Sequence, residues 1–223
     1  TGLAAINAAE DVKAQMVERA AKIWDTNEED VEYVAGIVQH KSDEELKLTF
    51  KDLARQLATT GGAISGRSNI DPTGEGNGYA VHLADVTVDP DTGKTDVTRF
   101  TAIQDAGKAI HPSYVEGQIQ GGAVQGIGWA LNEEYFFDSQ GQMANSSFLD
   151  YRMPTSLDLP MIDTVIVEVA NPTHPYGVRG VGEVCIVPPM AAIANAIHNA
   201  VGVRMEKLPM SPGNILEALW SQK

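Results

Sequence analysis

The chain contains very little cysteine, and this scarcity limits the chemistry open to it. Cys185 is the only cysteine among 223 residues, so no disulfide can form within the chain. Iron–sulfur clusters need several cysteine thiolates, and structural zinc sites combine cysteine with histidine. The five histidines are scattered, without the spacing of metal ligands. The sequence therefore predicts no metal ion held by protein side chains, and a reducing, cytoplasmic compartment.

Basic residues and long apolar runs are also scarce. Lysine and arginine total 16 against 30 acidic residues, which gives a net charge of −14. Nucleic-acid sites need a basic surface, so we expect no nucleic-acid partner. We find no apolar run of the length that a membrane span requires and no signal-peptide pattern. The chain opens on Thr1 rather than methionine, which predicts a fragment or a processed chain.

The periodicity of apolar residues predicts helices and strands in mixed order. Apolar residues recur at helical spacing in four segments, and they alternate or run together in others. The predicted helices are 3–24, 50–59, 189–201 and 212–220, and the predicted strands are 31–39, 79–89, 94–103 and 163–170, with a second hairpin at 133–138 and 142–146. This order predicts an α+β fold with mostly antiparallel strands. We treat 1–223 as one region, with the polar, glycine-rich loop 61–78 as the best candidate for an internal boundary.

A glycine-rich stretch leads directly to a single carboxylate. Gly177, Gly180 and Gly182 precede Glu183, and two prolines then open the predicted helix at 189–201. Glycine allows backbone angles that other residues avoid and permits close approach to another group. The loop therefore either delivers Glu183 to a fixed point for catalysis, or simply places an acidic residue near a helix N-terminus.

A second glycine-rich stretch has the spacing of a helix. Gln118, Gly121, Gly122 and Gln125 fall at i, i+3, i+4 and i+7, which places them on one helical face. Each glycine inside a helix costs about 0.5–1 kcal/mol relative to alanine. Two readings account for that cost. Either the helix packs tightly against another element, or a flat polar ligand rests on the glycines and bonds to the amides, which both donate and accept hydrogen bonds.

These two stretches together resemble the large, molybdopterin-binding subunit of the xanthine dehydrogenase and aldehyde oxidase family. The resemblance is carried by the stretches 105–131 and 176–199, in this order, and corresponds to the C-terminal part of that subunit. It implies that Glu183 is the general base of catalysis and that Gln118 contacts the cofactor. Gly121, Gly122 and Gly182 are the further cofactor-binding candidates, and Gly107 is an additional one.

The resemblance also implies a reaction and a set of partners. Members of the family hydroxylate an aldehyde, or a purine or other N-heterocycle, with oxygen from water at molybdenum. The metal is held by molybdopterin, either alone or as a dinucleotide. Iron–sulfur clusters and FAD are then expected on partner domains or subunits, and the rest of the molybdopterin subunit is expected to complete the pocket. This chain is expected to be inactive alone.

Several other residues have structural explanations, and two other functions stay open. Arg179 is interpreted as structural rather than as a substrate-steering cation, Cys185 as a core residue, and His174 as an ordinary loop residue. The segment 151–155 also resembles the family and is expected to be structural or to line the path to the metal. A non-catalytic binding or assembly module is the alternative function. A phosphate-binding loop at 177–182 is weaker, because it lacks the lysine and the serine or threonine of such loops.

Overall fold

The computed structural model describes residues 2–71, 74, 76–174 and 176–222, and the chain forms two compact units. The first unit is Thr1–Thr73 and the second is Gly74–Lys223. The division falls within the loop 61–78 that the sequence singled out, of which residues 72, 73 and 75 lie outside the described part. Each unit has its own buried core, so each is described separately.

The first unit packs two helices against a small antiparallel sheet. Its elements are α1 (Gly2–Trp24), η1 (Glu28–Asp30), β1 (Val31–Val34), β2 (Ile37–His40), β3 (Lys47–Thr49) and α2 (Phe50–Thr60). The sheet order is β1-β2-β3, and Met16, Val38 and Leu53 are fully buried in the core. The helix α2 begins where the Thr49 side chain accepts a hydrogen bond from the Asp52 N–H, as expected of an N-cap.

One strand prediction in this unit was wrong. The segment 31–39 was expected to be a single strand, but the structure turns at Ala35 and Gly36 and pairs β1 with β2. Both turn residues have positive φ, 49° and 86°. Alanine rarely adopts such angles, so the sequence carried no conventional turn signal at Ala35. The short strand β3 was not predicted.

The second unit is a three-stranded sheet with helices packed on it. Its elements are β4 (Ala80–Val88), β5 (Thr95–Asp105), α3 (Pro112–Leu131), β6 (Ile162–Val167), η2 (Val184–Ile186), α4 (Pro188–Val201) and α5 (Pro212–Trp220). The sheet order is β4-β5-β6. The strands β4 and β5 are antiparallel, whereas β6 runs parallel to β5 after the connection through α3. The predicted α+β class with mostly antiparallel strands is confirmed.

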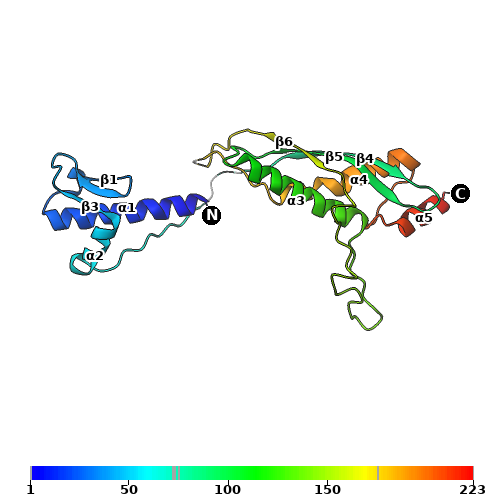
Figure 1. The fold of residues 1–223 in the computed structure, drawn as a ribbon, viewed down its shortest axis with the longest axis horizontal. Coiled ribbons are helices and arrows are strands. Elements are labelled where there is room, and N and C mark those ends of the chain that lie inside the picture. Colours follow the sequence, from blue (N-terminus) through cyan, green and yellow to red (C-terminus); the bar gives the residue numbers. More distant parts are fainter. Residues whose placement is uncertain (1, 72–73, 75, 175, 223) are drawn as a thin grey trace. The chain divides into compact units, whose positions relative to one another are not determined.

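The helices α3 and α4 share one core with the sheet (Figure 1). Phe100 of β5, Ile119 and Ile127 of α3, and Ile193 and Ile197 of α4 are all buried. The predicted helix at 189–201 is observed with its two prolines in the first turn. Proline is tolerated there because backbone N–H groups in the first turn have no partner within the helix. This packing fixes α3 and the start of α4 relative to each other, and both flank the candidate site.

The segment between α3 and β6 projects away from the sheet (Figure 1). We call residues 132–161 the arm. The hairpin predicted at 133–138 and 142–146 is present only as a turn with one bridge between Phe137 and Met143. The Asp138 N–H donates to the Gln142 carbonyl at 2.9 Å, and Gly141 adopts a φ of 78°. The arm therefore has a defined path without forming a sheet.

One stretch of the described residues is long and apolar enough, by length and composition only, to meet a membrane-span criterion. Val184–Val201 has a mean hydropathy of 1.5 over 18 residues. The stretch is divided into η2 and α4, and Pro189, Ile193 and Ile197 of α4 are buried in the core of the second unit. Only 22% of the stretch is buried, so packing within the unit accounts for the buried face of α4 and not for the whole apolar stretch.

A buried histidine makes the stability of the second unit depend on pH. His82 on β4 is 8% exposed, and neither ring nitrogen has a hydrogen-bond partner among the described residues. Burial lowers its pKa from 6.5 to about 4. Because the pKa of His82 is lower in the folded chain than in the unfolded chain, protonation of this ring favours unfolding. The stability that the neutral ring allows is therefore fully present above pH 6.5 and is lost as the pH falls from 6.5 towards 4.

We expect His82→Leu to remove that pH dependence. The wild-type chain should lose up to about 1.4 kcal/mol of unfolding free energy per pH unit in this range, because unfolding lets the ring take up a proton. Urea unfolding in a Trp24→Phe background, followed by the fluorescence of Trp129 and Trp220, which lie in the second unit, measures this dependence. An equally steep pH dependence in the variant would contradict the assignment to His82.

Candidate functional site

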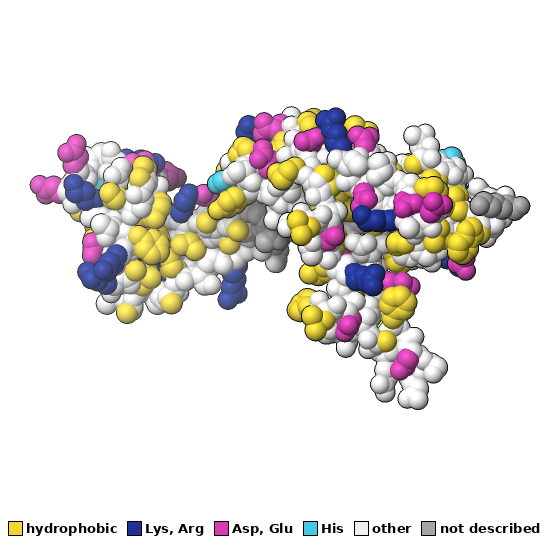
Figure 2. Space-filling model, turned by 45° about the vertical axis from the view of Figure 1, so that its right-hand side comes forward, with side chains coloured by type: hydrophobic (Ala, Val, Ile, Leu, Met, Phe, Trp, Pro, Cys, Tyr) yellow, Lys and Arg dark blue, Asp and Glu magenta, His cyan; other side chains and the backbone are white. Residues whose placement is uncertain are grey.

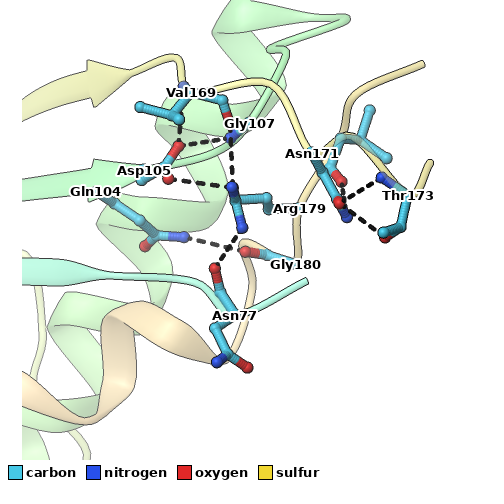
Figure 3. A network of polar contacts seen from close by, with 10 residues as sticks. Asn77, Gln104, Asp105, Gly107, Val169, Asn171, Thr173, Arg179 and Gly180 are labelled. Atoms are coloured by element: carbon cyan, nitrogen blue, oxygen red, sulfur yellow. Dashed lines mark hydrogen bonds and ion pairs between the residues drawn. The ribbon is translucent and has the colours of Figure 1, made fainter. Parts of the chain in front are cut away.

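Arg179 anchors the glycine-rich loop that precedes Glu183. Its Nε lies 3.1 Å from an Asp105 carboxylate oxygen, and the two side chains are only 11% and 10% exposed. The guanidinium also donates to the Val169 carbonyl at 3.1 Å and to the Asn77 carbonyl at 2.7 Å (Figure 3). Arg179 thus connects three other segments of the second unit to its own loop. The interpretation of Arg179 as structural agrees with this geometry.

The end of β5 forms the other half of this anchor. The second Asp105 oxygen accepts the N–H groups of Gly107 at 2.9 Å and Val169 at 3.2 Å. Gly107 has a φ of 64°, and a side chain there would meet the Gly177 carbonyl and lie 2.8 Å from the Arg179 nitrogen. Glycine is therefore required at this turn by backbone angle and by close approach. No contact in the described structure supports the predicted contribution of Gly107 to a cofactor site.

Gln104 holds the loop from inside the core. The side chain is fully buried, and its amide nitrogen donates to the Val181 carbonyl at 3.1 Å and to the Gly180 carbonyl at 3.4 Å. Figure 3 shows Gln104 beside the Asp105–Arg179 pair, reaching the same loop. These bonds act two and three residues before Glu183. The sequence analysis did not single out Gln104, because an amide in a predicted strand carries no signal of its distant partner.

The glycines of α3 serve two different purposes. Side chains at Gly122, Gly126 or Gly128 would collide with neighbours: Cys185 and Gly182, Ile186 and Pro189, or Glu133 and Pro154, respectively. Nothing in the described structure lies within 4 Å of a side chain placed at Gly117 or Gly121. Tight packing therefore explains Gly122, Gly126 and Gly128, whereas Gly117 and Gly121 leave open space in which a ligand could lie.

Gly122 departs from its expected place on the ligand face. It is buried, and its missing side chain leaves room for the Cys185 sulfur and the Gly182 carbonyl, the latter 3.1 Å from where a Cβ would stand. Helical spacing alone placed Gly122 beside Gly121, but the two lie on opposite sides of the boundary between core and solvent. Gly122 acts through packing of the 182–185 turn against α3.

That packing brings the predicted residues of the two stretches together. A Cβ on Gly182 would stand 2.9 Å from the Gln118 side-chain oxygen, so the loop backbone passes directly beside this amide. Glu183 follows Gly182 immediately, is exposed, and occupies the N-cap position of η2 with helical backbone angles and without a side-chain capping hydrogen bond. Two stretches more than sixty residues apart in sequence thus meet where Gln118 and Glu183 were expected to act together.

The exposed side of α3 carries two unengaged amides on either side of an open glycine. Gln118, Gly121 and Gln125 are exposed and follow one another at near one-turn spacing. Neither glutamine side chain forms a hydrogen bond with any described residue. The space above Gly121 and the free donors and acceptors of both amides suit a flat ligand with polar edges.

A cavity of about 600 Å³ continues this surface towards the arm. Gln125 and Trp129 of α3 form one wall, and Tyr135, Phe148, Tyr151 and Met153 are among the arm residues that form the other. The Tyr151 hydroxyl donates to Glu133 at 2.7 Å, and this bond, with burial, raises the pKa of Tyr151 to about 12. The segment 151–155 was expected to be structural or to line a path, and it lines this cavity.

Cys185 is a core residue, as the sequence analysis expected. It is fully buried, and burial raises the pKa of its thiol. The sulfur lies against the carbonyls of Gln118 and Gly182 at 3.3 Å. Within the part of the chain that the structure describes, no group of three histidine, cysteine, aspartate or glutamate side chains is placed to hold a metal ion. The surface around Gln118 offers amides and one nearby carboxylate rather than a set of metal ligands.

Comparisons with known proteins agree on one family. A profile of molybdopterin cofactor-binding domains matches residues 1–160. The xanthine dehydrogenase molybdenum-binding subunit of Escherichia coli O157:H7 is 35% identical over 211 residues, covering 92% of this chain and 28% of that protein. The carbon monoxide dehydrogenase large chain of Hydrogenophaga pseudoflava is 30% identical over 226 residues, covering 98% of this chain and 28% of that protein.

A solved structure supports the same relationship. Quinoline 2-oxidoreductase from Pseudomonas putida 86 superposes with a TM-score of 0.68 at 30% identity, covering 92% of this chain and 28% of that chain. The chain thus spans little more than a quarter of the length of the relatives that it matches. The profile match includes Gln118 and Gly121 but ends before Glu183, which the longer alignments cover.

Proposed function

Since this chain belongs to the family of molybdopterin cofactor-binding domains, we propose that it supplies one wall of a molybdopterin site and the general base of a molybdenum hydroxylase. The wall is the exposed side of α3, and the base is Glu183. The predicted family is confirmed by the comparisons, whereas the roles of these residues are our assignment. Without the remaining three-quarters of the family's subunit, this chain is expected to be inactive.

The observation that carries the proposal is the open position at Gly121. A side chain at Gly121 would meet nothing within 4 Å in the described structure, although alanine would stabilise the helix by about 0.5–1 kcal/mol. We attribute the open glycine to a ligand that lies against the helix, because Gly121 stands between two exposed glutamines on the same side of α3. The free amides of Gln118 and Gln125 on either side would hydrogen-bond to the polar edge of a pterin.

The residues of this chain would hold and orient the cofactor, and one of them would move a proton. The cofactor, when bound, supplies the metal and its redox chemistry. Glu183 would accept a proton from the attacking water-derived oxygen, because a general base must lie within hydrogen-bond reach of the proton that it removes. Arg179 and Gln104 hold the loop before Glu183, and Gly182 brings its backbone against Gln118. The base and the pterin edge would therefore be positioned by one rigid unit.

The substrate class is the finer part of the proposal. Relatives named for xanthine, carbon monoxide and quinoline share this part of the subunit with the chain. Those substrates differ greatly in size and polarity, so the shared part must contribute what their reactions have in common. We propose an aldehyde or a purine or other N-heterocycle as substrate, selected by sequence outside this chain.

Partner domains or subunits would carry the electrons away. The chain has one cysteine, and it is buried in the core, so it offers no ligand set for iron–sulfur clusters, which need several cysteine thiolates. We propose that clusters and FAD lie on other domains or subunits, and that the rest of the molybdopterin subunit completes the pocket. The cytoplasmic location expected from the sequence stays a prediction.

Gly121→Leu tests the proposed pterin contact. The leucine should leave the fold intact or slightly stabilise it, because the position is open and leucine favours helix over glycine. It should also lower the molybdenum and pterin content of the assembled enzyme several-fold, because it fills the space assigned to the cofactor. Metal analysis and the fluorescence of oxidised pterin measure the content, and urea unfolding measures the fold.

The matched control is Gly213→Leu. Gly213 is a helical glycine in α5 with an equally open position, so the same substitution is made away from α3. This control should keep both metal and pterin. Full cofactor content in Gly121→Leu would remove the exposed side of α3 from the site.

A further inference from the structure

The cavity between α3 and the arm has walls of aromatic rings. Its volume of about 600 Å³ lies within the range of small-molecule pockets, about 300–1,000 Å³. Trp129 contributes from α3, and Tyr135, Phe148 and Tyr151 contribute from the arm. The ring centroids of Tyr135 and Tyr151 lie 5.6 Å apart, and their planes are tilted by 39°. These two rings therefore form adjacent walls with different orientations.

A single carboxylate lies among these rings. Glu133 lines the cavity and is half-buried, and the Tyr151 hydroxyl donates to it at 2.7 Å. A side chain at Gly128 would collide with this carboxylate, so the glycine leaves room for it against α3. Within the described part of the chain, no basic side chain pairs with Glu133. Its negative charge therefore borders the cavity without a counter-ion from these residues.

The rest of the lining adds no positive charge. Gln125, Ser146 and Ser147 border the cavity, and their side chains can accept hydrogen bonds. No described residue that lines the cavity is basic, and the chain as a whole carries −14. Hydrophobic and acidic side chains are both visible on the projecting arm in Figure 2. Surroundings of this charge repel an anion and attract a cation.

We propose that this cavity binds a small organic cation, an alkylated ammonium ion, with its charge beside Glu133 and its alkyl groups against Trp129 and Tyr135. Aromatic faces attract an ammonium ion that lies within about 6 Å of the ring centroid, and the carboxylate supplies the opposite charge. A neutral occupant of the same shape would remove water from the carboxylate without providing a counter-ion, which is unfavourable. The lining therefore selects a cation over a neutral molecule.

The cavity is distinct from the site assigned to the pterin. It begins at Gln125, which lies about one turn beyond Gly121 on α3. Neither Gln118 nor Glu183 is among the residues that line it. Binding of a cation in this cavity therefore goes beyond the proposed function and does not rest on it.

Choline and dimethylbutanol, in which carbon replaces the ammonium nitrogen, test the proposal in the assembled enzyme. The two molecules have nearly the same shape, but only choline is charged. Isothermal titration calorimetry should show choline binding roughly tenfold more tightly than the alcohol, because the rings favour a cation. Glu133→Gln should weaken choline binding by roughly tenfold, because the opposite charge is lost. It should leave the alcohol's affinity unchanged, because glutamine keeps the size of the side chain and an acceptor for the Tyr151 hydroxyl.

The matched control is Glu134→Gln. Glu134 is exposed and is the next residue in the chain, but it does not line the cavity. The same loss of charge there should change the dissociation constant of choline by less than about twofold, because salt screens an exposed charge. Tyr135→Leu should weaken choline binding, whereas Tyr135→Phe, which keeps the aromatic face, should not. Thermal unfolding of each variant should stay close to that of the wild type.

Three results would overturn the proposal. One is equal affinity for choline and dimethylbutanol, which would identify an apolar cavity that does not select charge. Another is an equal loss of choline binding in Glu133→Gln and Glu134→Gln, which would mean that choline responds only to the net charge of the chain. The third is the absence of choline binding in the assembled enzyme, which would mean that another part of the enzyme fills the cavity.

Discussion

Glu183→Gln should lower the rate at which substrate reduces the assembled enzyme by roughly 10²–10⁴-fold, the usual contribution of a general base. Glutamine keeps the size of the side chain but cannot accept the proton. The loop should keep its position, because Arg179 and Gln104 hold it through contacts that do not involve the Glu183 side chain. Stopped-flow reduction by an aldehyde and by a purine, with equal molybdenum in both proteins, measures the effect.

The matched control for this experiment is Glu116→Gln. Glu116 is an exposed carboxylate on α3, two residues before Gln118, and its substitution makes the same change of charge close to the site. We expect Glu116→Gln to react at nearly the wild-type rate. If Glu183→Gln reacts as fast as this control, Glu183 is a structural residue at the start of η2 and the catalytic assignment fails.

Arg179→Met should destabilise the second unit by about 3–5 kcal/mol, the usual cost of removing one partner of a buried ion pair. The Asp105 side chain, which is only 10% exposed, would lose its cationic partner. The substitution also removes the donors to the Val169 and Asn77 carbonyls. Urea unfolding in a Trp24→Phe background, followed by the fluorescence of Trp129 and Trp220, measures the change. Arg179→Lys should recover only part of the loss, because an ammonium cannot reproduce the guanidinium fork.

A double-mutant cycle separates the ion pair from the rest of the network. Combining Arg179→Met with Asp105→Asn removes both charges, so the pair should be less destabilised than the sum of the two single variants. An additive result would mean that Arg179 and Asp105 do not interact energetically. A stability change below about 1 kcal/mol in Arg179→Met, the range of an exposed pair, would contradict the burial of the contact.

Local signals in the sequence located most helices closely. The last helix was predicted at 212–220 and is observed as Pro212–Trp220, because proline favours the first turn. The helix α2 ends at Gly61, whose φ of 129° stops it. Such signals are carried by single residues and need no distant partner. The turn at Ala35 lacked one, and the predicted strand across it was therefore wrong.

Long-range partners were beyond sequence reasoning. Apolar periodicity predicted β5 and β6, but not that β6 lies parallel to β5, because periodicity does not specify which strands pair. Asp105 and Arg179 are 74 residues apart, and neither is unusual in its own segment. The buried amide of Gln104 likewise has partners that only the fold reveals.

The sequence proposed residues for the candidate site, but it did not predict how those residues are arranged. Family resemblance selected Gln118, Gly182 and Glu183, and the fold brings their two stretches into contact. Helical spacing grouped Gly121 with Gly122, but spacing cannot separate an open position from a packed one that lies 100° around the helix. The structure makes that distinction, and it turns two competing readings of the glycines into two separate roles.

The molybdenum and pterin content of the assembled enzyme tests the central claim most directly. The complex that contains this chain should be purified from molybdate-supplied cells and analysed for metal by mass spectrometry and for oxidised pterin by fluorescence. Our account predicts molybdenum and pterin in equal amounts, one of each per copy of the chain. A fully assembled complex that lacks both would contradict the account, and it would favour a binding or assembly module that keeps the fold without the chemistry.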